Sequence, residues 1–124
     1  MPSLRVGIIG DPVTHSISPV MQQPALDLLG IDAVYEKWPT AAAELPDRIA
    51  SLRSPDALGA NVTAPHKLAA MTLIDDLTPF ARRLGAVNTI VNRDGTLTGD
   101  NTDAHGFASA LTNPQGRCRV HRTL

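Results

Sequence analysis

The sequence predicts an α/β domain, a three-layer α/β/α open sheet that is mostly parallel and has an antiparallel hairpin at one edge. Short apolar segments alternate along the chain with segments whose apolar residues recur at helical spacing. This alternation is typical of parallel strands connected by helices, and such connections are right-handed. Near the end, Asp94-Gly95 separates two strand-like segments with no helix between them, which predicts a tight hairpin.

The strands are predicted from short apolar or alternating runs that are closed by turn residues. The run from Leu58 to Val62 is nearly all apolar, so we expect a central strand that is covered on both faces. The predicted strand ranges are 5–9, 33–38, 58–62, 86–92 and 96–100.

The helices are predicted mainly from their end signals. Ser18 before Pro19 indicates an N-cap followed by proline at the first helical position, and Gly30 indicates the end of that helix. Pro24 lies inside it and is expected to kink it, because proline lacks a backbone N–H. Further helices are predicted around the apolar stripe Leu45, Ile49 and Leu52, from Thr78-Pro79 to Gly85, and from residue 102 or 103 to residue 112.

A helix is also expected directly after the third strand, with Lys67 in its first turn. A cation there lies at the positive end of the helix dipole and is locally unfavourable by up to ~1 kcal/mol. Because folding alone would not select such a residue, Lys67 is the first candidate for a functional role.

Composition and charge restrict the class of protein. The chain has 124 residues, of which 43% are hydrophobic and 19% charged, as in one ordinary globular domain. We expect that domain over residues 1–112, followed by a polar, basic tail or truncated linker over residues 113–124 that is poorly ordered. The net charge of -1, with both signs interleaved, argues against nucleic-acid and membrane partners.

Several sequence features predict a cytoplasmic location. Cys118 is the one cysteine, which rules out an internal disulfide and fits a reducing compartment. No run reaches the ~20 apolar residues that a membrane-spanning helix needs, and the first residues do not match a signal peptide.

Polar side chains collect where the predicted strands end, which is where open α/β sheets bind ligands. They offer hydroxyls, amides, one ammonium and one carboxylate, without metal-ligand spacing or a phosphate-binding loop. Such groups suit a small polyhydroxylated acid better than a nucleotide. The candidate residues are Ser16, Ser18, Asn61, Thr63, Lys67, Asn88 and Asp103.

Each candidate also has an ordinary structural interpretation. Ser18 and Asp103 could serve only as helix caps, and Lys67 could be a solvated surface lysine. The binding-site interpretation is preferred because it explains all the candidates together. A dinucleotide fingerprint is not supported, because the spacing of Gly7 and Gly10 is wrong for one.

Four motifs in this order resemble the substrate-binding domain of shikimate dehydrogenases. They are His15-Ser16-Ile17-Ser18-Pro19, Asn61-Val62-Thr63-Ala64-Pro65-His66-Lys67, Gly85-Ala86-Val87-Asn88-Thr89 and Asn101-Thr102-Asp103. Members of this family reduce 3-dehydroshikimate to shikimate with NADPH, in the pathway to aromatic amino acids. The resemblance implies NADP as the cofactor and shikimate or 3-dehydroshikimate as the ligand.

The resemblance also implies roles for the candidate residues. Ser16 and Ser18 would hold the substrate carboxylate, and two serines here favour shikimate over quinate. The ring hydroxyls would be bound by Asn61, Thr63, Asn88 and Asp103. Lys67 and Asp103 match the catalytic pair of the family, with Lys67 transferring the proton and Asp103 orienting it.

The sequence departs from the family pattern at two places. Gln22 and Gln23 stand where the family usually has His-Asn. The glycine-rich NADP-binding domain that follows in family members does not follow here, so we expect this polypeptide alone to have negligible turnover. The alternatives are a stand-alone module that binds shikimate or quinate, and a half that pairs with a separate NADP-binding chain. Weak self-association to a homodimer is a further expectation.

Overall fold

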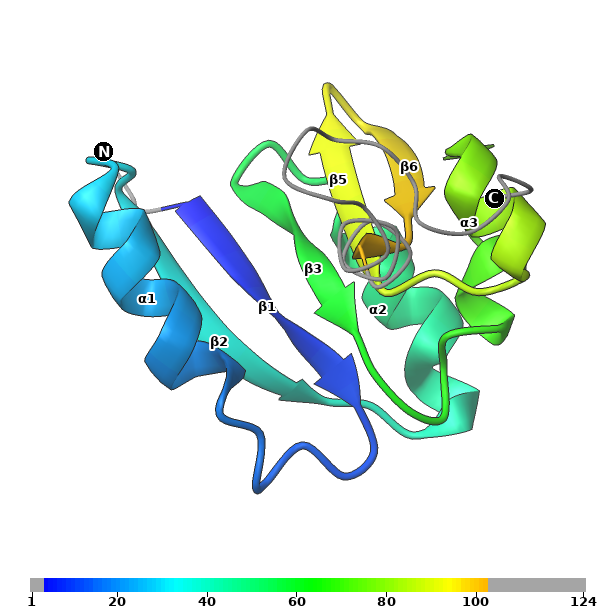
Figure 1. Ribbon diagram of the computed structural model, residues 1–124, viewed down its shortest axis with the longest axis horizontal. Helices are drawn as coiled ribbons and strands as arrows, with labels where there is room; N and C mark the ends of the chain where they lie inside the picture. Colours follow the sequence, from blue (N-terminus) through cyan, green and yellow to red (C-terminus); the bar gives the residue numbers. More distant parts are fainter. Residues whose placement is uncertain (1–3, 103–124) are drawn as a thin grey trace, which may run out of the picture.

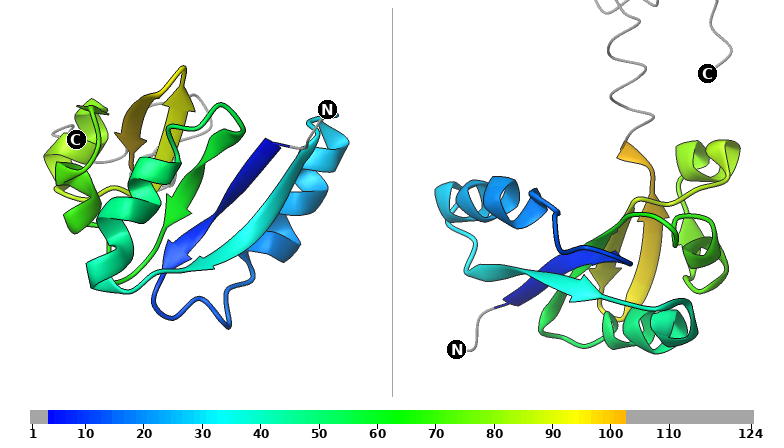
Figure 2. Two further views of the ribbon diagram at one scale, coloured as in Figure 1. Left: turned by 180° about the vertical axis from the view of Figure 1, so that it is seen from behind. Right: turned by 90° about the horizontal axis from the view of Figure 1, so that it is seen from below.

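The computed structural model describes residues 4–102, in which helices pack against a six-stranded sheet (Figure 1). In chain order the elements are β1 (Leu4–Gly10), α1 (Ser18–Leu28), β2 (Ala33–Pro39), the 3₁₀ helix η1 (Ala42–Glu44), α2 (Leu45–Ser51), β3 (Ala57–Val62), the 3₁₀ helix η2 (Ala69–Thr72), β4 (Asp76–Leu77), α3 (Pro79–Leu84), β5 (Thr89–Arg93) and β6 (Thr96–Asp100). Helices α1 and α2 cover opposite faces of the sheet, as the view from below in Figure 2 shows. The predicted α/β fold is therefore confirmed.

The sheet has the strand order β2-β1-β3-β5-β6-β4. Strand β1 pairs in parallel with both β2 and β3, whereas β5 pairs antiparallel with β3 and with β6. The two-residue strand β4, which the sequence did not predict, extends the sheet beyond the hairpin by pairing in parallel with β6. Because β5 and β6 form an antiparallel pair, the start of β5 and the end of β6 lie at the same edge as the carboxyl ends of β1 and β3.

Two apolar clusters fill the two faces of the sheet. Alternation along β1 sends Ile8 toward α1 and Ile9 toward α2, so the two residues belong to different clusters. Trp38 packs on the α2 face directly over Gly7, where a Cβ atom would lie 2.6 Å from the indole Cδ2. Close packing therefore explains Gly7 without any nucleotide.

Most predicted elements are present within a few residues of their expected bounds. The stripe on α2 is confirmed, since Leu45, Ile49 and Leu52 are all nearly fully buried. The hairpin is also confirmed, because Asp94 (φ 53°) and Gly95 (φ 88°) both have the positive φ of a type I′ turn.

Two helix predictions need correction. Helix α1 begins at Ser18 itself, its N-cap position is Ile17, and no side chain caps it there. Lys67 does not lie in the first turn of a helix but in a turn that precedes the short helix η2. The Lys67 carbonyl accepts from the Val87 N–H at 2.9 Å. This carbonyl therefore bonds to a distant segment of the chain rather than to a residue of the same helix. The helix-dipole argument for Lys67 therefore fails.

The predicted last helix, with Asp103, and the predicted tail lie outside the described residues. Across residues 4–102, no helix is long and apolar enough to span a membrane.

Candidate functional site

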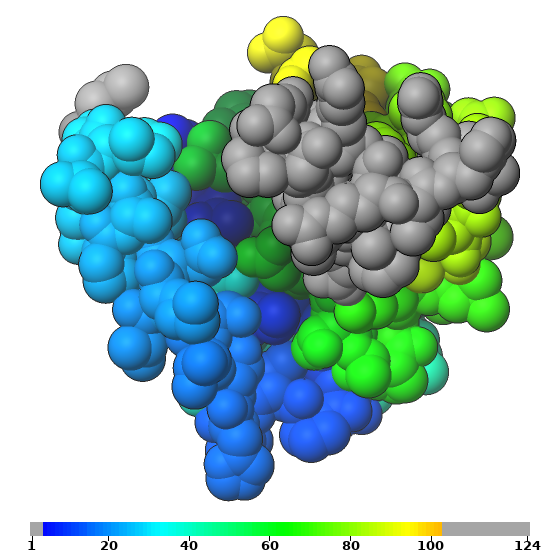
Figure 3. Space-filling model, viewed as in Figure 1, coloured from blue at the N-terminus to red at the C-terminus, as the bar shows by residue number. Residues whose placement is uncertain are grey.

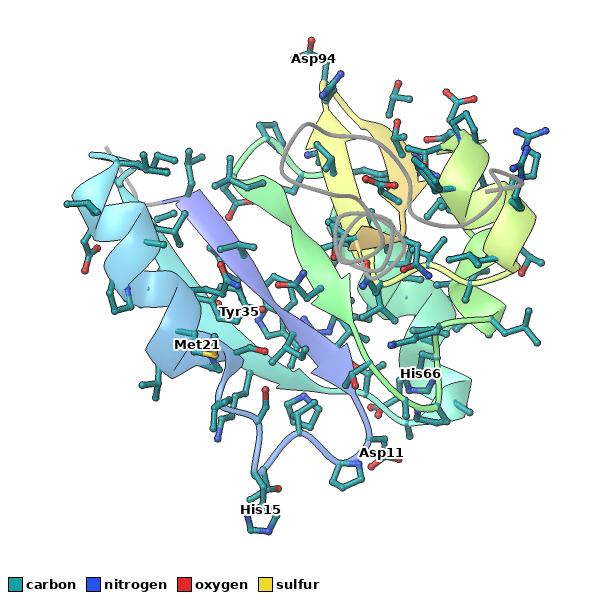
Figure 4. The ribbon with its side chains drawn as sticks, in the orientation of Figure 1. Asp11, His15, Met21, Tyr35, His66 and Asp94 are labelled. Atoms are coloured by element: carbon teal, nitrogen blue, oxygen red, sulfur yellow. The ribbon has the colours of Figure 1, made fainter. Side chains whose placement is uncertain are left out.

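The candidate site lies at the edge of the sheet where β1, β3 and β6 end and β5 begins. The loop from β1 to α1 carries Ser16, Ser18 is the first residue of α1, and the turn after β3 carries Thr63 and Lys67. In Figure 4 Asp94, at the tip of the hairpin, lies at the opposite edge from His15 in the β1–α1 loop. The topology therefore brings segments distant in sequence to one side of the molecule.

Backbone hydrogen bonds tie these segments together. The Val62 N–H donates to the Asn88 carbonyl at 2.8 Å, and the Asn88 N–H donates to the Asp100 carbonyl at 3.0 Å. The bond from Val87 to the carbonyl of Lys67 fixes the lysine turn beside the same segment. Asn88 is thus the point at which the end of β3, the lysine turn and the end of β6 meet.

A chain of side-chain hydrogen bonds crosses this edge. The Tyr35 hydroxyl donates to Asn61 Oδ1 at 2.6 Å, and Asn61 Nδ2 donates to Thr89 Oγ1 at 3.4 Å. The Thr89 hydroxyl donates to Asn88 Oδ1 at 2.9 Å. Thr102 completes the chain, since its N–H and hydroxyl both donate to Asn88 Oδ1, at 3.0 and 3.3 Å. Two predicted site residues, Asn61 and Asn88, are therefore linked through the Thr89 hydroxyl.

The serine loop reaches the same chain through Tyr35. Ser16 Oγ accepts from the Ser18 N–H at 3.2 Å, so Ser16 supplies the first turn of α1 with a side-chain acceptor. Burial raises the pKa of Tyr35 to about 12, and the hydrogen bond from Ser18 opposes part of that rise. Tyr35 is accordingly a neutral hydroxyl donor throughout the neutral pH range.

Thr63 is placed by the strand that precedes it. Its N–H donates to the Ile9 carbonyl at 2.9 Å, which continues the pairing of β1 with β3 beyond the ends of both strands. Its methyl group lies over Gly10, where a Cβ atom would come within 2.4 Å of Thr63 Cγ2. Gly10 therefore permits this close approach of the two loops.

A cavity of about 200 Å³ lies on the α1 side of the sheet, next to the hydrogen-bond chain. Tyr35, Asn61 and Thr89 line it together with Leu26 of α1 and Gly59 of β3. Figure 3 shows the hollow between α1 and β3 from outside. Of the predicted site residues, Asn61 lines this cavity, whereas the two serines, Thr63, Lys67 and Asn88 lie outside its lining.

Several other titratable groups have structural partners away from this edge. His66 is 2% exposed and its Nε2 lies 2.6 Å from the Thr40 carbonyl, which fastens the turn after β3 to the end of β2. Arg53 forms an ion pair with Asp75 at 2.6 Å, and this bond lowers the pKa of the Asp75 carboxyl. The carboxylate also accepts from a backbone N–H of β6, so the pair anchors the hairpin. Among residues 4–102, no group of three His, Cys, Asp or Glu side chains could hold a metal ion.

Sequence reasoning missed two contributors and left a third unexplained. Tyr35 and Thr89 were not among the candidate site residues, although Tyr35 is the one tyrosine of the chain and a buried phenol must find a partner. The structure also shows what Gln23 does. Its Nε2 donates to the Ala33 carbonyl at 2.8 Å, and its Oε1 accepts from the Tyr35 N–H at 2.7 Å. The Gln23 amide thus pairs with edge strand β2 as a neighbouring peptide group would.

Comparisons with known proteins agree on one family. The family model for the shikimate dehydrogenase substrate binding domain matches residues 8–90. The NADP(+) shikimate dehydrogenase of Symbiobacterium thermophilum is 47% identical over 110 residues, which is 89% of this chain and 37% of that protein.

Solved structures show the same similarity. Shikimate 5-dehydrogenase of Thermus thermophilus, solved with NADP(H) and shikimate, matches with a TM-score of 0.81 and 45% identity, over 87% of this chain and 41% of that one. The 5-ketofructose reductase of a Gluconobacter strain matches with a TM-score of 0.83 and 32% identity, over 90% and 41%. The chain therefore spans about two fifths of the length of the proteins it resembles.

Proposed function

We propose a function for this chain on the premise that it belongs to the shikimate dehydrogenase family, as a substrate-binding domain of that family. The proposed role is to bind shikimate or 3-dehydroshikimate for an NADP-dependent dehydrogenase. The observation that carries the proposal is the convergence of amides, hydroxyls and the Lys67 turn, from four separate segments, around Asn88.

The proposed chemistry follows from the groups at this edge. Hydride addition to a ketone leaves negative charge on the ketone oxygen, and a nearby cation that can also donate a proton stabilises that charge. Lys67 is proposed for this role, with Asp103 to orient it. Ser16 and Ser18 are proposed to bind the carboxylate, while Asn61, Thr63 and Asn88 are proposed to bind ring hydroxyls.

The solved relatives raise a choice of substrate, because one of them is named as a 5-ketofructose reductase. A ketose has hydroxyls but no carboxylate, whereas shikimate and quinate have both. Two serine hydroxyls, one in the β1–α1 loop and one at the start of α1, favour a carboxylate ligand, because a hydrogen bond from a hydroxyl is stronger when the acceptor is charged. We therefore propose shikimate rather than 5-ketofructose as the preferred ligand.

The test measures binding of shikimate, quinate and 5-ketofructose to the 124-residue chain. Each ligand is titrated while the backbone amide signals are monitored by NMR. We expect shikimate to shift signals of the serine loop, the Lys67 turn and the segment around Asn88. Lys67→Ala should weaken binding at least roughly tenfold, since a charge-assisted contact contributes ~1.5–3 kcal/mol. Arg93→Ala removes one positive charge at the hairpin end of the sheet and is the matched control.

Two results would contradict the proposal. One is the absence of shifts with shikimate at about 10 mM, which corresponds to an affinity weaker than roughly 3 kcal/mol. The other is equal weakening by Lys67→Ala and Arg93→Ala. The same sample with NADPH and 3-dehydroshikimate tests the expectation that these 124 residues alone bind without turnover, because measurable NADPH oxidation would refute it.

A further inference from the structure

The hydrogen bonds that link Tyr35, Asn61, Thr89 and Asn88 all donate in one direction, from Tyr35 toward Asn88. This direction determines which group Asn88 can offer to a ligand. A phenol has a single proton, and Tyr35 gives it to Asn61 Oδ1 at 2.6 Å. A phenol oxygen can also accept, so the direction is fixed from the other end: Asn88 Oδ1 accepts from the Thr102 backbone N–H, and Thr89 must therefore donate to Asn88. Thr89 then accepts from Asn61 Nδ2, which leaves Asn61 Oδ1 to accept the Tyr35 proton.

The last amide of the chain is held in one orientation. Asn88 Oδ1 accepts from the Thr89 hydroxyl and from both the N–H and the hydroxyl of Thr102. With that oxygen serving three donors, the group that Asn88 can offer to a ligand is its NH2. An amide held in this way presents a donor, so the complementary ligand atom is an oxygen acceptor.

We infer that Tyr35 is a positioning residue of the shikimate site: its hydroxyl holds the Asn61 amide and, through Thr89, reinforces the orientation in which Asn88 presents its NH2 to a ring oxygen of the ligand. This inference rests on the function proposed above. It assigns Tyr35 no contact with the ligand, because the residue acts through the amides. Loss of the Tyr35 hydroxyl would free the Asn61 amide to rotate and would weaken the Thr89 bond to Asn88 Oδ1, which keeps its two donors from Thr102. Recognition of ligand oxygens would be weakened as a result.

Three features make Tyr35 a suitable start for the chain. The residue is 7% exposed, so water does not compete easily for the hydroxyl. Its backbone N–H is held by Gln23 Oε1, which fixes the position of the residue along β2. Its pKa of about 12 keeps the hydroxyl protonated wherever the protein is assayed near neutral pH.

The experiment compares Tyr35→Phe with Thr40→Val in the full 124-residue chain. Thr40→Val also removes one buried hydroxyl, which donates to the Trp38 carbonyl at 2.8 Å. That hydroxyl does not belong to the series of hydrogen bonds from Tyr35 to Asn88. Dissociation constants are measured by NMR titration for shikimate and for cyclohex-1-ene-1-carboxylate, which retains ring and carboxylate but has no hydroxyls. The side-chain amide signals of Asn61 and Asn88 are recorded without ligand.

We expect Tyr35→Phe to raise the dissociation constant for shikimate about five- to tenfold, as for loss of one oriented hydrogen bond. The constant for the carboxylate without hydroxyls should stay unchanged, and the two asparagine amide signals should shift. Thr40→Val should change neither constant and neither signal. If Tyr35→Phe fails to fold, Thr89→Val interrupts the same chain one step later and should give the same pattern.

The failures can be told apart. If the unmodified chain does not bind shikimate, the proposed function is wrong and the role of Tyr35 in recognition falls with it. If the unmodified chain binds but Tyr35→Phe binds equally well, only the inference is overturned. Equal weakening of both ligands, or asparagine signals that do not move, would show that Tyr35 supports the fold alone.

Discussion

The amide of Gln23 should stabilise the edge of the sheet, and Gln23→Ala measures how much. Two of its three hydrogen bonds, of 2.8 and 2.7 Å, join helix α1 to the Ala33 carbonyl and the Tyr35 N–H of β2. The third, from Nε2 to Asp27 Oδ1 at 3.0 Å, is exposed and stays within the helix, so it contributes little. Ala33 and Tyr35 are each under one tenth exposed. Gln23→Ala therefore leaves a buried carbonyl acceptor and a buried N–H donor without these partners. At ~1 kcal/mol for each bond, we expect a loss of about 2 kcal/mol in the free energy of unfolding.

The assay is urea unfolding of Gln23→Ala beside Gln22→Ala. Gln22 is the exposed neighbour in the same helix, so both variants gain the same helix propensity from alanine and their difference isolates the hydrogen bonds. A loss of 2 kcal/mol corresponds to a fall of roughly 8–16 °C in melting temperature for a domain of this size. Hydrogen exchange at the Tyr35 amide should accelerate in Gln23→Ala alone.

A difference below about 0.5 kcal/mol between the two variants would refute this reasoning. It would mean that water replaces the amide at the edge of β2 without cost, and that the two short distances do not reflect a stabilising contact. Unchanged exchange at Tyr35 would lead to the same conclusion.

Further predictions concern the Thr78 cap, the glycines at positions 59 and 85, and the buried Tyr35 phenol. Thr78→Ala removes the side chain that caps α3 by accepting from a first-turn N–H at 3.3 Å; it should cost ~1 kcal/mol in a urea melt, and Thr78→Ser should restore most of the loss. Gly59→Ala places a methyl group 2.0 Å from the Ile90 carbonyl oxygen at a φ of 151° and should cost roughly 3 kcal/mol or more. At Gly85 φ is 70° and no atom lies within 4 Å of an added Cβ, so Gly85→Ala should lower the free energy of unfolding by only about 1–2 kcal/mol. Equal melting temperatures for the two glycine variants would contradict the view that close packing at Gly59 adds to the loss. Burial raises the pKa of Tyr35 from 10.0 to about 12, so its stabilising effect is intact below pH 10 and lost as the pH rises toward 12; this part of the alkaline decline should be missing in Tyr35→Phe, and identical pH profiles would show that the phenol is not protected.

Local signals predicted much of the fold because each depends on neighbouring residues. The Thr78 cap, the Gly85 end of α3 with φ of 70°, and the Asp94-Gly95 turn are all present. Each is a short-range preference of the backbone that tertiary contacts have no reason to override. The predicted N-cap at Ser18 was wrong by one position, since Ser18 is the first helical residue and Ile17 is the N-cap. The side chain of Ser16 accepts the Ser18 N–H instead.

The site was predicted only in part. The sequence placed polar residues after particular strands, and a binding function for them stays a prediction. Lys67 was selected through a helix that does not form at that position, so its candidacy now rests on its turn being fixed beside Asn88 and on the family resemblance. Asp103 lies outside the described residues.

By itself the sequence determined the identity and order of most elements, since apolar periodicity and turn residues act over a few positions. Only the tertiary structure decided that β5 runs antiparallel to β3, with Thr89 opposite Asn61. It also decided that Tyr35, 26 positions before Asn61 in the sequence, lies within hydrogen-bond distance of it. Contacts of this kind depend on how whole strands pair and on which face each side chain occupies, and a one-residue change of register would send the same side chains to the other face.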